Sequence, residues 1–110
     1  MSEGPYSEEL IQETASDIQN YLELTSSLVP LEFEDYQKLR DRLVIVISEM
    51  LDDDFNRLLN LLYRMDVSEE KVKRAFVPGQ PGSISEDLAD LVLQREIQKI
   101  LTRRKYKDPE

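Results

Sequence analysis

The 110-residue chain contains no cysteine, no histidine and no tryptophan. Without cysteine it can form neither a disulfide nor a zinc–thiolate site, and it has no thiol nucleophile. Without histidine it lacks the commonest general base, the commonest metal ligand and the usual pH switch. These absences predict a protein that is not an enzyme and holds no metal or cofactor. They also suit a reducing compartment, and we expect a cytoplasmic protein.

Glycine is scarce as well, with three residues in the whole chain, so neither GxGxxG nor the GxxxxGK[ST] phosphate loop can be written. No apolar run approaches the length of a membrane span, and the acidic N-terminus lacks the pattern of a secretory signal.

The run of acids at 52–54 suggests a calcium loop. An EF-hand starting at Asp52 would need glycine where Arg57 stands and glutamate where Tyr63 stands, so we interpret these acids as helix caps.

Basic residues are missing from the first 37 residues, which contain nine acids. The net charge is −9, whereas the last sixteen residues carry six bases and three acids. An acidic body repels phosphate, so we expect no nucleic-acid partner and, with no apolar span, no membrane partner. The sequence leaves open whether the acidic first helix and the basic C-terminal end pair with each other or form a binding surface.

Apolar spacing predicts an all-α compact bundle of four main helices plus one short helix, in a single domain over residues 1–110. Residues 1–6 are expected to be a loose leader and 105–110 a basic tail. We expect helices from 8 to 24 or 25, from 34 or 35 to about 51, over 54–66, from 69 to about 76 and from about 86 to 104. The β-branched run 43–47 could also be a strand, but the flanking spacing favours a helix.

The segment 50–76 is the most apolar and best delimited part of the chain, and we expect the fold to be organised around it. Within this segment, the apolar arc of the helix expected over 54–66 is wide enough to contact two or more neighbouring helices. Ser7 and Ser68 are predicted N-caps, and Ser83 with Glu86 has the spacing of a capping box, with Ser85 as a rival cap. The apolar connection 25–33 is interpreted as a loop over the core edge, or alternatively as a patch for a partner.

The last helix has an apolar face that shifts along its length, so one neighbour cannot cover all of it. Either the helix lies deep in the bundle or its C-terminal half packs on another subunit. The candidate partner contact on that half consists of Leu93, Ile97, Leu101, Arg103 and Arg104.

We therefore predict a non-catalytic protein–protein interaction module: an adaptor, a regulator or a homodimeric structural unit. The partner would be another protein or a second copy of the chain. An alternative is an acidic inhibitor that occupies a basic cleft through the first helix, using Glu8, Glu9, Glu13 and Asp17. A carboxylate-based enzyme or ligand-binding bundle is a third possibility, and Glu96 is the acid that projects nearest to an apolar stripe.

Overall fold

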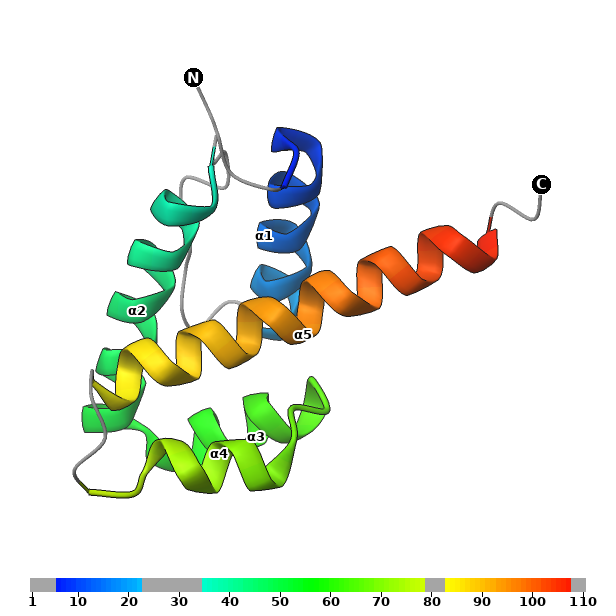
Figure 1. The fold of residues 1–110 in the computed structure, drawn as a ribbon. Coiled ribbons are helices and arrows are strands. Elements are labelled where there is room, and N and C mark those ends of the chain that lie inside the picture. The colour runs from blue at the N-terminus through cyan, green and yellow to red at the C-terminus, as the bar shows by residue number, and fades with distance from the viewer. Residues whose placement is uncertain (1–5, 23–34, 79–82, 108–110) are drawn as a thin grey trace.

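The computed structural model describes residues 6–22, 35–78 and 83–107. These residues form five helices, and the predicted all-α bundle of four main helices plus one short helix is confirmed (Figure 1). The helices are α1 (Glu8–Leu22), α2 (Tyr36–Asp53), α3 (Phe55–Arg64), α4 (Glu69–Ala75) and α5 (Ile84–Lys107). The β-branched run 43–47 is helical. Most of the expected leader, the connection 25–33 and residues 108–110 lie outside the described residues.

Polar caps start the helices where the sequence predicts them. Ser7 Oγ accepts a hydrogen bond from the Leu10 amide at 3.1 Å, and Ser68 Oγ accepts one from the Lys71 amide at 3.4 Å. Ser83 and Glu86 form the capping box, with reciprocal bonds of 3.0 and 3.4 Å, and α5 begins two residues earlier than expected. Each cap satisfies an amide that has no partner inside its helix.

A left-handed residue ends α3. Asp66 has φ of 63°, the amide of Val67 donates to the Leu62 carbonyl at 3.1 Å, and the Asp66 amide donates to the Tyr63 carbonyl at 3.0 Å. These two bonds define a Schellman motif, which closes the helix and turns the chain toward α4. The helix therefore stops two residues before its predicted end.

The helix at the centre of the fold is α5, not the segment 50–76. It crosses the molecule with α1 and α2 on one side and α3 and α4 on the other (Figure 1). The residues of α5 that are buried are Leu88, Ala89, Val92, Leu93, Glu96, Ile97 and Ile100. Its shifting apolar face is thus explained by deep placement among several helices, the first of the two alternatives.

Specific polar contacts fix the neighbouring helices around α5. Arg40 of α2 binds Asp90 of α5 through two hydrogen bonds, and Ser48 of α2 bonds to Ser85 at 2.7 Å. The C-terminal carbonyls of α1 accept hydrogen bonds from Arg57 and Arg64 of α3. Since α1 has no basic residue in its own last turn, these arginines supply the positive charge that a helix C-terminus favours.

The start of the described chain is packed rather than loose. The ring of Tyr6 lies 5.6 Å from that of Tyr36, between the centroids, and both contact the small cluster of Leu10, Ile97 and Ile100. At the other end, Lys105 belongs to α5 instead of a tail. Within residues 6–22, 35–78 and 83–107, no helix has the length and apolar character needed to cross a membrane.

Candidate functional site

The fold buries part of the predicted partner contact on α5 and leaves the rest of it exposed. Leu93 is fully buried and Ile97 is 4% exposed, so these two residues belong to the core and do not form the exposed surface that we expected. Leu101 is 46% exposed and remains on the surface. The apolar spacing alone could not separate these positions, because the packing of α1 over the C-terminal half of α5 depends on residues far away in the sequence.

The two arginines of that predicted contact bind α1. Arg103 lies 2.9 Å from the Asp17 carboxylate, and Arg104 lies 2.6 Å from that of Glu13 (both measured from Nη2). The acidic helix and the basic helix end therefore pair with each other. Of the four carboxylates assigned to an inhibitory surface, only Glu8 and Glu9 lack a partner in this pairing, which leaves little of that acidic face.

A polar cluster lies at the contact between α1 and α5. The ammonium group of Lys99 donates to Tyr21 Oη at 2.9 Å and to the Met65 carbonyl at 3.1 Å, and it lies 3.4 Å from Glu96 Oε1. Glu96 is 1% exposed. The cation beside Glu96 is therefore Lys99, which lies one turn further along α5.

Burial raises the pKa of the Glu96 carboxyl above its usual range. The Asp17 carboxyl, within hydrogen-bonding reach, raises this pKa further, whereas the Lys99 ammonium group opposes the shift. Asp17, Asn20, Tyr21, Glu96 and Arg103 line a hollow of about 290 Å³. Raised carboxyl pKa values occur at catalytic sites, but here the nearby cations already bind the chain's own groups.

Three large side chains of α3 stay exposed on one side of the helix: Phe55 (43%), Leu59 (40%) and Tyr63 (83%). Their spacing of four residues places them along one line, which we call the α3 stripe; it extends over about 12 Å. The other apolar residues of α3, among them Leu58 and Leu62, are buried. The sequence did signal this surface, because the apolar arc is wider than one contact requires, but we expected neighbouring helices to cover it.

The charges around the α3 stripe are unevenly placed. Three exposed acids, Asp52, Asp53 and Asp54, directly precede Phe55, and the sequence has no lysine or arginine between Arg42 and Arg57. The arginines of α3 instead reach α1, as described above. Asp54 also caps α3 by accepting from the Arg57 amide at 3.2 Å. One end of the stripe is thus strongly acidic.

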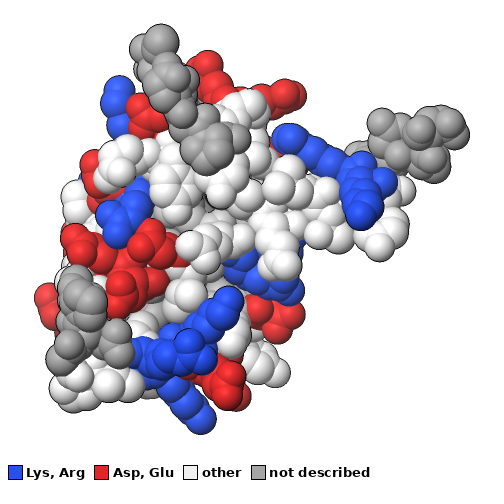
Figure 2. All heavy atoms as spheres, in the orientation of Figure 1, with Lys and Arg blue, Asp and Glu red and all other residues white. Residues whose placement is uncertain are grey.

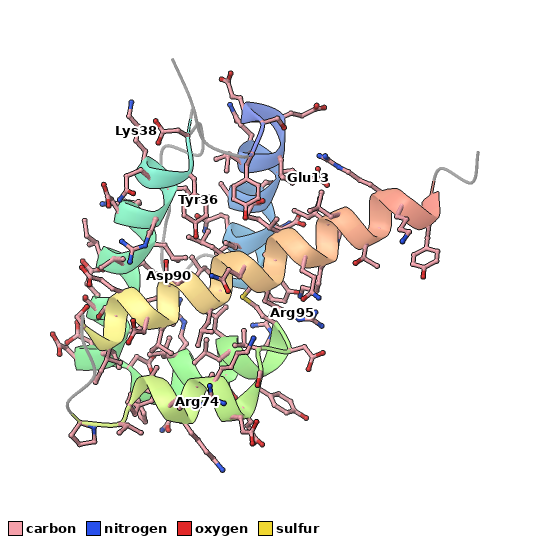
Figure 3. All side chains as sticks on the ribbon, in the orientation of Figure 1. Glu13, Tyr36, Lys38, Arg74, Asp90 and Arg95 are labelled. Atoms are coloured by element: carbon pink, nitrogen blue, oxygen red, sulfur yellow. The ribbon has the colours of Figure 1, made fainter. Side chains whose placement is uncertain are left out.

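Separate charged patches lie over α4 and the N-terminal part of α5 (Figure 2). Figure 2 shows basic side chains gathered over α4 and acidic ones over the N-terminal part of α5. A hollow of about 380 Å³ lies between them, lined by Lys71 and Arg74 on one side and by Asp87 and Asp90 on the other. Figure 3 labels Arg74 and Asp90, which come from the two helices that border this hollow.

In the part of the chain that the structure describes, no group of three or more acidic side chains is arranged to hold a metal ion. The buried polar residues there are Thr14, Ser85 and Glu96. The hydroxyl of Thr14 donates a hydrogen bond to the Leu10 carbonyl, and that of Ser85 bonds to Ser48. Of these three residues, Glu96 is therefore the one with a side-chain oxygen that lacks a hydrogen bond. Comparison of the chain with protein-family models, with curated proteins and with solved structures found no match.

Proposed function

We propose that this protein is a non-catalytic protein–protein interaction module that binds its partner through the α3 stripe. The observation that carries this proposal is the row of Phe55, Leu59 and Tyr63, left exposed on a helix whose other apolar residues are buried. Aromatic residues are enriched in the centres of protein interfaces, and contiguous apolar surface favours burial against a partner.

Contacts with neighbouring residues also fix the orientation of the α3 stripe. The ring of Phe55 meets that of Phe76 edge-on, with 5.9 Å between the centroids, so the residue that follows α4 supports its orientation. Buried Leu58 and Leu62 fix α3 against the core. A preorganised surface binds with a smaller loss of side-chain entropy than a mobile one.

The charge beside the stripe supports a partner with a complementary end. Because the three aspartates directly precede Phe55, a partner with an apolar ridge and basic residues at that end would match both features. The absence of cysteine supports the cytoplasm as the place of action. Homodimerisation through the stripe is a form of the same proposal.

The test compares two double variants. Leu59→Ala with Tyr63→Ala removes the stripe, and Leu101→Ala with Tyr106→Ala removes exposed side chains of the same kinds from α5. Mass in solution is measured by light scattering across a concentration range, and captured proteins are identified from a cell extract. We expect the wild type and the α5 variant to form the same assembly and the stripe variant to lose it, with unchanged circular dichroism.

The charged end is tested separately. Asp52→Asn with Asp53→Asn should weaken the same assembly and reduce its salt dependence, whereas Glu8→Gln with Glu9→Gln should not. The proposal fails if the stripe variant assembles as the wild type does, or if the wild type is monomeric and captures nothing that the stripe variant does not.

A further inference from the structure

The carboxyl group of Glu96 is buried at the contact between α1 and α5 without a full set of partners. It is 1% exposed, and its Oε1 atom has no hydrogen bond within the described residues. The Lys99 ammonium group is 3.4 Å away from this atom, a contact that lacks hydrogen-bond geometry. An ionised carboxylate is unfavourable in such a place unless it is both paired and hydrogen-bonded.

The groups that face Glu96 come from α1 and α5. Asp17 and Tyr21 belong to α1, and Lys99 and Arg103 belong to α5. Both cations already bind other atoms. Lys99 donates to Tyr21 and to the Met65 carbonyl, and Arg103 binds the Asp17 carboxylate. The ionised form of Glu96 therefore faces a second carboxylate with incomplete compensation.

We propose that Glu96 is a proton-operated latch that fastens α1 to α5. In the protonated form its carboxyl group donates a hydrogen bond to the Asp17 carboxylate across the two helices. In the ionised form the two carboxylates repel each other, and α1 loosens from the C-terminal half of α5. This device is separate from the α3 stripe and does not depend on the function proposed for it.

The direction of the pH effect follows from the pKa of Glu96, which is raised from 4.5 by burial first and by Asp17 second. A raised pKa in the folded chain means that the folded state binds this proton more tightly than the unfolded state. The latch is thus closed at acidic pH. Its contribution to the free energy of unfolding falls as pH rises from 4.5 through the pKa of the folded state.

Hydrogen exchange of the full chain measures the latch in α1. After correction for the intrinsic exchange rate, the amides of α1 in the wild type should lose protection as pH rises from acidic to alkaline values. The isosteric variant Glu96→Gln should remove this pH-dependent loss. Glu49→Gln, which neutralises an exposed acid of α2, is the matched control and should behave as the wild type.

Carboxyl NMR titration reads the proton directly. Asp17→Asn should lower the pKa of Glu96, whereas Glu13→Gln should leave it unchanged, although both variants remove the partner of an arginine in α5. A Glu96 carboxyl that titrates as exposed glutamates do would overturn the proposal. So would an α1 helix whose protection depends on pH equally in the wild type and in Glu96→Gln.

Discussion

The guanidinium group of Arg40 binds the Asp90 carboxylate through two hydrogen bonds, 2.6 Å from Nε and 3.2 Å from Nη2, and so joins α2 to α5. Lysine cannot reproduce this two-bond geometry. Arg40→Lys should therefore lower the free energy of unfolding by ~0.5–1 kcal/mol, a modest effect because both side chains are partly exposed. Urea denaturation measures it, and a double-mutant cycle with Asp90→Asn isolates the pair. Additive effects in that cycle would contradict the prediction.

Ile97 and Leu101 lie one helical turn apart but differ in burial, 4% against 46% exposed. Ile97→Ala should lower the free energy of unfolding by about 2–4 kcal/mol because it leaves a cavity beside Leu10 and Ile100. Leu101→Ala should change it by less than about 0.5 kcal/mol. Ile97→Glu should unfold the chain, because Ile97 belongs to the core and not to the exposed partner contact that the sequence predicted. Equal effects of the two alanine variants on chemical denaturation would place Ile97 on the surface.

Asp66 adopts a left-handed backbone while its side chain pairs with Arg95 at 2.9 Å. Asparagine tolerates this backbone, so Asp66→Asn should lose only an exposed ion pair, less than about 1 kcal/mol. Asp66→Val should lower the free energy of unfolding by a further ~1–2 kcal/mol, since a β-branched residue is unfavourable at positive φ. Thermal unfolding of the two variants gives the comparison. If valine were no worse than asparagine, the turn would not require a left-handed residue.

Burial and the nearby Asp90 raise the pKa of the Tyr36 hydroxyl above 10.0. The folded chain then keeps this proton at a pH where the unfolded chain releases it. The associated stability is fully present below pH 10 and is lost as pH rises through the pKa of the folded state. Ultraviolet absorbance of tyrosinate should show that Tyr36→Phe removes the step at highest pH, and Tyr106→Phe, an exposed control, should not. Loss of the same step in both variants would contradict this assignment.

Features that depend on a few neighbouring residues could be predicted from the sequence. The caps at Ser7 and Ser68 and the capping box of Ser83 and Glu86 are all formed. Their geometry involves residues three apart, so the local pattern contains the whole interaction. The same holds for the helical spacing of 43–47, in which Ile45 is exposed while Leu43 and Ile47 are buried.

Features that depend on which helices meet could not be predicted in the same way. We expected α3 to be covered along its whole apolar arc, yet Phe55 and Leu59 remain exposed. We expected Ile97 at the surface, yet α1 packs over it. Both errors have one cause: periodicity gives the direction of an apolar face but not the number of neighbours that cover it. Glu96 combines the two cases. The helical spacing predicted its position near an apolar stripe, but it did not predict that the side chain is buried.

The Lys99 ammonium group holds Tyr21 of α1 and the carbonyl of Met65 at the end of α3 together on α5. Its distance of 4.9 Å from the centre of the Tyr21 ring adds a cation–π contact. Three segments therefore meet at one ammonium group, which α5 supplies and to which α1 and the turn after α3 are both attached. Such sharing makes unfolding cooperative in this region: α1 and the turn after α3 should open together, as one unit, rather than fray independently.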